Sequence, residues 1–356
     1  MTNQRSFIKV LSTILCLLLL TCSVAWPVAG QKGLAPGQQA GIPEGYIVVE
    51  GDILIRRSHY QSFISGAYLS ANTQLWPNGV VPFEFDSNCG PGSMTCVNAA
   101  NQTDMLNAMA ELENVAGVDF QQCNNNKCAG NFVHVQANPQ FNNSAVGVQG
   151  GQQVINIVSW SDRFRIVHEL MHCVGFYHEQ SRPGRDDFVT INTANTQNGM
   201  AGNFTEQKDA AVYGWYDFDS VMHYSKCAFS IGCGTDPSGN PIQNCNSCPG
   251  KETITVNDPY KEEWQDRIGQ RDHLSYLDKM TLSMMYPRAN WRFVDLNYNG
   301  GNGSQNGSFR RPYRDLATGI TNTPLRGTLW IQPGAYTGFF NKNITFQAPL
   351  GGVTLR

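Results

Sequence analysis

The spacing of hydrophobic residues along the chain predicts two helices and several strands. Apolar side chains recur at helical spacing in residues 102–115 and again in residues 162–174, so each segment would bury one face. Four further segments have the alternating or clustered apolar residues of strands: 46–55, 80–85, 132–135 and 153–158. We therefore expect a folded domain that begins near Leu75.

The last part of the chain has a different pattern. Clusters of Gly and Asn precede two strand-like stretches, LWIQPGAYTG and ITFQAPLGGVTLR, which contain glycine turns. This pattern predicts a small β-rich accessory module at residues 289–356. The segment loosely resembles the first coils of a right-handed parallel β-helix, although too few residues remain for a long solenoid. The partners we consider for such a module are a glycan or a surface.

The beginning of the chain has the pattern of a signal peptide. Two basic residues precede an apolar run at residues 10–26, and small residues follow it, so we expect residues 1–30 to be removed. The alternative is an uncleaved membrane anchor, since the run approaches the length of a span. The polar stretch that follows lacks a stop-transfer charge cluster, which favours a secreted protein without stable membrane insertion. Residues 31–68 would then form a pro-segment.

Length and charge exclude one class of partner. At 356 residues the chain has room for a leader, one catalytic domain and a smaller module. Its formal net charge of −3 provides no basic field that would gather phosphates. We therefore expect no nucleic-acid partner.

The cysteines predict local disulfides in an oxidising compartment. Of 11 cysteines, two fall in the predicted signal peptide, and eight of the rest form close pairs along the sequence. These pairs are Cys89 with Cys96, Cys123 with Cys128, Cys227 with Cys233, and Cys245 with Cys248. A structural zinc site is the alternative for the last four, but they contain only one C-x-x-C knuckle. Cys173 remains as a buried free thiol.

The segment HELMHCVGFYH contains candidate catalytic chemistry. His168 and His172 are four residues apart on a predicted helix, so both rings can reach one zinc ion, and Glu169 can reach a water on it. Gly175 can adopt the left-handed conformation that ends the helix and brings back His178 as a third ligand. Three protein ligands leave an open position, which is typical of catalytic zinc.

The residues that follow His178 indicate which family the segment resembles. Glu179 and Arg182 continue the pattern as HEQSR, and SVMHY follows at residues 220–224. These residues resemble the signature and the Met-turn of the astacin family of metzincin peptidases. The resemblance implies an α+β, two-lobed zinc peptidase domain at residues 69–288. It also implies a secreted endopeptidase that hydrolyses peptide bonds of protein or peptide substrates.

The resemblance also assigns roles to single residues. Met222 would be an apolar floor beneath the zinc, and Tyr224 would contact the resting metal and then the oxyanion. Glu179 would be structural. Asp52 would correspond to the aspartate of the family's F-x-G-D pro-segment motif, which occupies the open zinc position in a latent proenzyme. Val49 departs from that motif, and an ordinary acidic turn is the alternative for Asp52.

The resemblance further implies a mechanism. Zinc would lower the pKa of a water towards about 7, and Glu169 would take the proton and return it to the leaving amine. The alternative function is a secreted adhesion or carbohydrate-binding protein whose peptidase domain is an inactive scaffold. Every matched catalytic position is intact in the sequence, which argues against that alternative.

Overall fold

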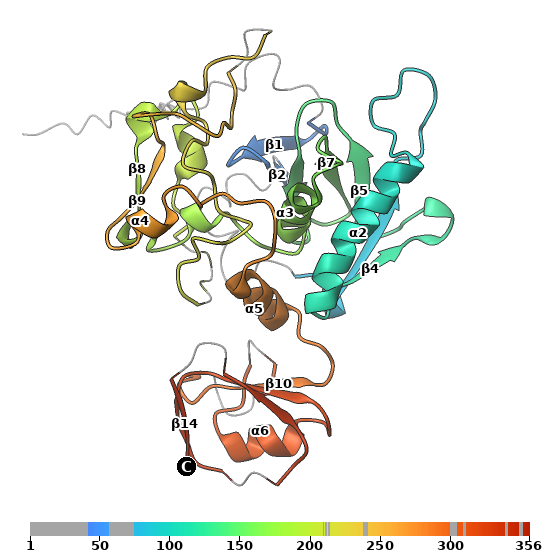
Figure 1. Ribbon diagram of the computed structural model, residues 1–356. Coiled ribbons are helices and arrows are strands. Elements are labelled where there is room, and N and C mark those ends of the chain that lie inside the picture. Colours follow the sequence, from blue (N-terminus) through green and yellow to red (C-terminus); the bar gives the residue numbers. More distant parts are fainter. Residues whose placement is uncertain are drawn as a thin grey trace, which may run out of the picture.

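The computed structural model describes most of the chain beyond the predicted leader (Figure 1). The described residues are 42–56, 75–208, 210, 212, 214–237, 241–299, 305–308, 311–338, 341–348 and 352–356. The predicted signal peptide lies outside them. The described part of the predicted pro-segment is residues 42–56.

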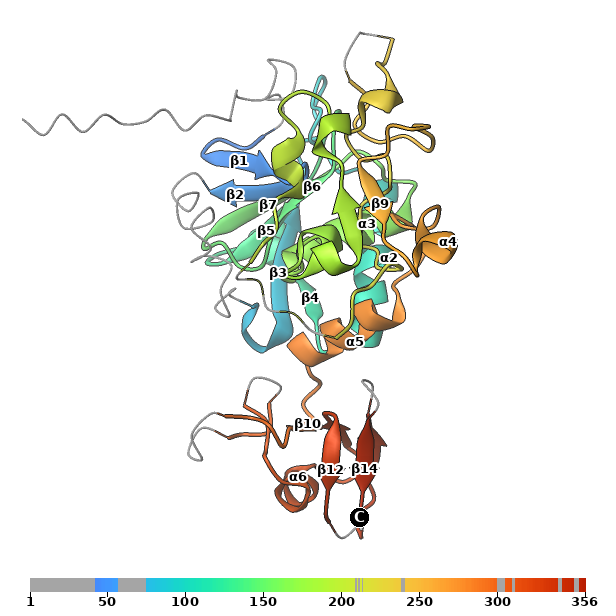
Figure 2. The same ribbon diagram turned by 90° about the vertical axis from the view of Figure 1, so that its left-hand side faces the viewer.

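The main sheet of the described residues has seven strands, two of which lie in the predicted pro-segment. Their order is β1 (Tyr46–Val49), β2 (Ile53–Arg56), β6 (Asn143–Ala145), β7 (Gln152–Ile157), β5 (Phe132–Ala137), β3 (Val80–Phe85) and β4 (Asp119–Gln122). Strands β3, β4, β5 and β7 are parallel to their neighbours in this group, while β6 runs antiparallel to β7. The β1–β2 hairpin extends the sheet beside β6 (Figure 2).

The strand predictions within the domain are confirmed, and one segment differs. The continuous alternation predicted at residues 46–55 is divided into two strands by a tight turn. At this turn Glu50 and Gly51 have positive φ angles of 47° and 81°. Such angles reverse the chain, so the two halves of the segment pair with each other instead of continuing as one strand.

Two helices pack against the sheet and complete the main core. The helix predicted at residues 102–115 is α2 (Ala99–Val115), which begins three residues earlier because the Asn98 side chain accepts the N–H of Asn101 at 3.0 Å. Met105, Met109 and Leu112 on its predicted face are buried. The second helix is α3 (Arg163–Cys173). Buried side chains of α2, α3 and the sheet belong to one hydrophobic cluster, so these elements share a single core.

A second lobe follows α3 and has little regular structure. Its strands β8 (Val189–Ile191) and β9 (Ile254–Val256) pair antiparallel, and its helices are α4 (Lys261–Trp264) and α5 (Tyr276–Met285). The short 3-10 helices of the domain are η3 (Pro77–Gly79), η4 (Asn124–Asn126), η5 (Glu179–Ser181), η6 (Arg185–Asp187), η7 (Thr193–Asn195), η8 (Ala201–Phe204) and η9 (Ile231–Cys233). Aromatic side chains fill the second lobe, with Phe188 stacked on Tyr216 at 4.7 Å between ring centroids. The α+β class is confirmed.

The C-terminal module is rich in parallel strands. Strands β10 (Trp291–Val294), β11 (Thr328–Ile331) and β13 (Thr345–Gln347) form one sheet, and β12 (Gly334–Tyr336) pairs with β14 (Val353–Leu355). Helix α6 (Leu316–Asn322) lies against β10, and Phe293 packs with Met280 and Met284 of α5. The resemblance to a β-helix stays a prediction. Within the described residues, every helix is too short or too polar to cross a membrane.

Two of the four predicted disulfides are confirmed and two are wrong. Cys89 is bonded to Cys96, and Cys123 to Cys128. The last four cysteines form nested bonds instead, Cys227–Cys248 and Cys233–Cys245. The chain folds back on itself here, with a bridge between Thr235 and Pro241, so cysteines at mirrored positions meet. Cys173 is the buried free thiol as predicted, and burial raises its pKa to about 12.

Candidate metal centre

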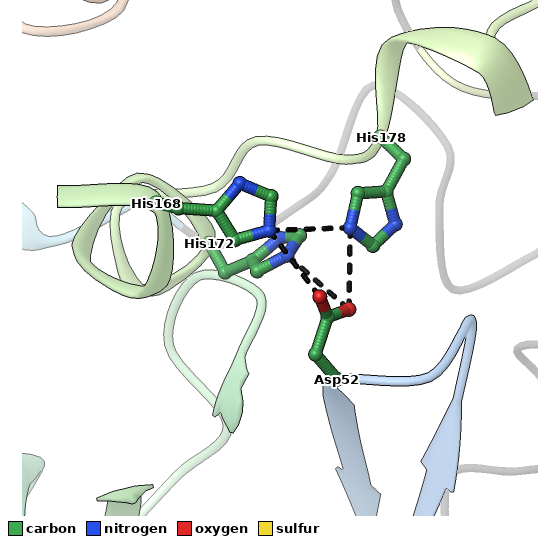
Figure 3. A group of neighbouring side chains, drawn as sticks. All are labelled: Asp52, His168, His172 and His178. Atoms are coloured by element: carbon green, nitrogen blue, oxygen red, sulfur yellow. Dashed lines mark hydrogen bonds and ion pairs between the residues drawn. The ribbon is translucent and has the colours of Figure 1, made fainter. Parts of the chain in front are cut away.

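Helix α3 places the first two histidines on one buried face. The helix begins after Asp162, whose side chain accepts the N–H of Arg165 at 3.2 Å. His168 and His172 are one turn apart, and both side chains are buried. Their ring centroids lie 4.8 Å apart, so both rings can face one point (Figure 3).

A turn at Gly175 returns the chain to that point. Gly175 has a φ angle of 110°, and its N–H donates to the carbonyl of His172 at 2.8 Å. A side chain with a Cβ would be strained there, so glycine suits the turn. His178 follows it, with its Nε2 3.3 Å from Nε2 of His168. The predicted arrangement of three histidines is present.

The Asp52 carboxylate completes the group from the turn between β1 and β2 (Figure 3). Its oxygens lie 3.3 Å from His168 Nε2, 3.6 Å from His172 Nε2 and 3.2 Å from His178 Nε2. Ligand atoms placed tetrahedrally around one zinc ion are about 3.3–3.4 Å from each other. The three distances from Asp52, and the 3.3 Å between His168 Nε2 and His178 Nε2, are therefore close to those expected of zinc ligands.

The hydrogen bonding of the group also fits a metal. Within the described part of the chain, His172 Nε2 and Asp52 Oδ1 are buried and make no hydrogen bond, although Asp52 Oδ1 lies 3.2 Å from His178 Nε2 as an ion pair. Burial holds the pKa of His168 well below its ordinary value and also lowers the pKa of His172. Neutral imidazole is the form in which histidine binds metal. The residues present fit zinc, and one ion would account for the two unpartnered atoms.

The outer ring nitrogens of the histidines have different kinds of partner. His168 Nδ1 donates to the carbonyl of Val221 at 2.8 Å, and His172 Nδ1 donates to the carbonyl of Phe176 at 2.8 Å. His178 Nδ1 instead contacts the Glu50 carboxylate at 2.9 Å. Glu50 could not be identified from the sequence, because nothing in the local pattern links it to a histidine 128 residues away.

Carboxylates also set the charge of the third histidine. Burial alone would lower the pKa of His178, but Asp52 and Glu50 raise it to about 9. Burial alone would raise the pKa of Asp52, and the surrounding histidines hold it well below its ordinary value. Without a metal, the group therefore favours an ionised carboxylate beside a charged His178.

Helix α5 holds the Met-turn against the histidines. The Asp278 carboxylate accepts the N–H of Val221 at 2.9 Å and the hydroxyl of Ser220 at 2.7 Å. Asp278 is itself fixed by a capping box with Ser275 at the start of α5. This network orients Val221, whose carbonyl binds His168. Met222 follows and is buried.

Tyr224 contacts the predicted pro-segment in this structure. Its hydroxyl donates to the backbone carbonyl of Glu50, and its ring centroid lies 4.4 Å from that of His178. Among the histidines, cysteines and carboxylates of the described residues, the candidate ligands are Asp52 and the three histidines, and no distance relates the Tyr224 hydroxyl to them. The predicted contact of Tyr224 with the metal therefore stays a prediction.

Glu169 directly follows His168 in α3, and part of its carboxyl group is free to accept a proton. Its side chain is buried, and Oε2 has no hydrogen-bond partner among the described residues. Burial raises the pKa of Glu169 well above its ordinary value, the Asp52 charge raises it further, and Arg271 opposes both. A carboxyl group in such surroundings has the affinity for protons that a general base needs.

Glu179 supports the loop after the third histidine. It binds the guanidinium of Arg182 at 2.7 Å and accepts the N–H of Asp217 at 2.9 Å. Burial raises the pKa of Glu179. These contacts tie the loop of His178 to residues just before the Met-turn.

Comparison with known proteins gives one family. The model of the Astacin peptidase family matches residues 68–239. Zinc metalloproteinase nas-15 of Caenorhabditis elegans is 31% identical over 217 residues, which cover 60% of this chain and 32% of that protein. Tolloid-like protein 1 of Mus musculus is 34% identical over 175 residues, covering 48% of this chain and 16% of that protein. A solved structure, the hatching enzyme zinc-protease HCE-1 of Oryzias latipes, is similar with a TM-score of 0.45 and 28% identity over 59% of this chain and 90% of that one.

The matched region includes most of the metal centre. The three histidines, Glu169 and the Met-turn all lie within residues 68–239, whereas Asp52 lies before them. The chain spans 32% and 37% of the lengths of the first two curated relatives.

Proposed function

Residues 68–239 belong to the astacin family of zinc metallopeptidases, and from this premise we propose that the chain is a secreted endopeptidase made as a latent precursor. The observation that carries the proposal is the buried group of three histidines, together with the buried Glu169 next to His168 in the same helix. His168, His172 and His178 would hold the ion. When bound, zinc supplies a Lewis acid that lowers the pKa of a water and polarises a carbonyl.

Glu169 is the general base of the proposed reaction. Its unpartnered Oε2 can accept a proton from the attacking water. The same carboxyl group then donates that proton to the leaving amine, which restores the base for the next turnover. Glu169 lies next to His168 in α3, so the helix that positions two ligands also positions the base.

Tyr224 and Met222 have supporting roles in the proposal. In the precursor the Tyr224 hydroxyl donates to the Glu50 carbonyl. Loss of the pro-segment would leave the phenol oxygen free to contact the metal, and the hydroxyl free to donate a hydrogen bond to the developing oxyanion of the substrate. Met222 is buried in the core that contains α3, where its thioether would form the floor under the histidines. Glu179 holds the loop of His178 in place.

Asp52 accounts for latency. Its carboxylate lies within 3.6 Å of all three ring nitrogens, where it excludes a water and a substrate carbonyl from the centre. The hairpin that contains it is part of the main sheet, so its release requires cleavage between the hairpin and the peptidase domain. The predicted pro-segment, residues 31–68, is consistent with such a cut.

The remaining proposals concern location and partners. Four disulfides among the described residues suit an oxidising compartment and support secretion. Protein or peptide chains are the proposed substrates, since the family consists of peptidases. A glycan or surface contact of the C-terminal module stays a prediction.

Replacement of the base tests the proposed function. We expect processed Glu169→Gln to keep zinc at the level of the wild type and to lose most turnover of a protein substrate. Glu262→Gln, an exposed change in α4, is the matched control and should be fully active. Full turnover by zinc-loaded Glu169→Gln would refute the assignment. A wild-type protein that binds zinc but cleaves nothing would favour the inactive adhesion scaffold.

A further inference from the structure

The three candidate zinc ligands differ in where their outer partners come from. His168 and His172 donate to carbonyls of Val221 and Phe176, which belong to the peptidase domain. His178 contacts the carboxylate of Glu50, which belongs to the pro-segment hairpin. Processing would thus remove the outer partner of one ligand and leave those of the other two.

Glu50 is built into this position and is not an ordinary surface turn residue. It is 2% exposed, and its second carboxylate oxygen accepts a hydrogen bond from the Gln207 side chain. Its backbone carbonyl accepts the Tyr224 hydroxyl. Its φ angle of 47° is unusual for a residue with a side chain, so the surrounding contacts must hold it there.

An outer carboxylate changes how a histidine binds metal. It fixes the ring orientation and raises the basicity of the nitrogen that faces the ion. A carboxylate does this more strongly than a carbonyl because it has a full negative charge. The ring of His178 is therefore better prepared for zinc in the precursor than after the pro-segment has left.

We propose that Glu50 is a positioning residue that strengthens zinc binding by the precursor through the outer nitrogen of His178. The inference rests on the proposed function as a zinc peptidase with a removable pro-segment. It adds a second task to the pro-segment, which both blocks the centre through Asp52 and helps to load it through Glu50. Zinc would be acquired before processing, while Glu50 is in place.

Zinc affinity of the unprocessed chain tests the proposal. The apparent dissociation constant is measured by competition with a chromogenic chelator, in precursors that all keep Asp52. Glu50→Gln keeps an acceptor but loses the charge, and we expect roughly tenfold weaker binding; Glu50→Ala loses both, and we expect about 100-fold. Glu44→Gln removes the same charge from an exposed position of the segment and should bind zinc like the wild type.

Processing provides a second comparison. After removal of the pro-segment, the proteins made from the wild type and from Glu50→Gln are chemically identical, so their zinc affinities must converge if Glu50 acts only in the precursor. A difference that persists would indicate a folding defect and overturn the proposal, as would equal affinity of all four precursors. If Glu50→Ala does not fold, the zinc affinity of the Glu50→Gln precursor alone decides whether the proposal holds. A wild-type precursor that binds no zinc would instead refute the proposed function.

Discussion

Gly51 lies directly against the ring of Phe229. A Cβ atom added to Gly51 would be 2.4 Å from Phe229 Cζ, far closer than two carbon atoms approach without a bond. Tyr224 and Phe204 also pack against this ring, at centroid distances of 5.7 and 6.2 Å, and limit its movement. The turn that presents Asp52 thus fits against the second lobe only because residue 51 has no side chain.

We therefore expect Gly51→Ala to weaken the docking of the hairpin. The clash and the φ angle of 81° together should cost about 1–3 kcal/mol, which corresponds to roughly 5- to 150-fold more of the undocked form. The measurement is cleavage of a fluorogenic peptide by the unprocessed precursor. Gly45→Ala is the matched control, since Gly45 has a similar φ of 83° but no atom within 4 Å of the added Cβ. A Gly51→Ala precursor as inactive as the control would contradict this account of the contact.

Asp52→Ala should activate the precursor more directly. The change removes the carboxylate that contacts all three histidines, while the backbone of the hairpin can stay in place. We expect measurable peptide cleavage without processing, at a rate below that of the processed enzyme because Glu50 still binds Tyr224. The assay is the same, with Glu44→Ala as the control. If the Asp52→Ala precursor is as inactive as the wild type, Asp52 is an ordinary turn residue.

Asp217 should make stability fall with rising pH. Burial and the nearby Asp278 raise the pKa of Asp217 to about 7, compared with about 3.9 in an unfolded chain. The folded state therefore binds the Asp217 proton more tightly than the unfolded chain does. The resulting stabilisation of the folded state is fully present below about pH 3.9 and is lost as pH rises through about 7. Asp217→Asn should remove this pH dependence. In the wild type it changes the free energy of unfolding by a few kcal/mol in total, about 1.4 kcal/mol for each pH unit between the two pKa values.

Urea unfolding of the full chain at about pH 5 and about pH 8, on either side of the raised pKa, measures this effect. The wild type should lose more stability than Asp217→Asn between the two values. Asp187→Asn changes an exposed carboxylate and should behave like the wild type. If stability changes equally with pH in all three proteins, ionisation of Asp217 does not destabilise the folded state and the prediction is wrong.

The part of the site that could be predicted from sequence is the part fixed by local geometry. His168 and His172 are one helical turn apart, and Gly175 permits the turn to His178, so spacing alone brings the three rings together. The contact of Glu50 with His178 joins residues far apart in sequence and depends on how the hairpin docks on the sheet. The spacing of residues along the sequence does not predict how the hairpin docks.

The same limit explains the two wrong disulfides. Closeness in sequence correctly paired Cys89 with Cys96, which are seven residues apart with no helix or strand between them. Between Cys227 and Cys248 the chain forms its own turn, which separates near neighbours and joins mirrored positions. Sequence separation is a sound guide to pairing only where the chain between two cysteines does not fold back.

Proteolysis without reduction distinguishes the two pairings. Trypsin can cut after Lys226 and Lys251 and release one peptide with all four cysteines, and a protease that cuts before Asp236 divides it between Cys233 and Cys245. With the nested bonds, both disulfides cross the cut, so the two fragments should stay joined in the mass spectrum until a reductant is added. With near-neighbour bonds, neither disulfide crosses it, and the fragments would separate at once. Reduced and alkylated peptide is the control for complete cleavage, because it must give two fragments under either pairing.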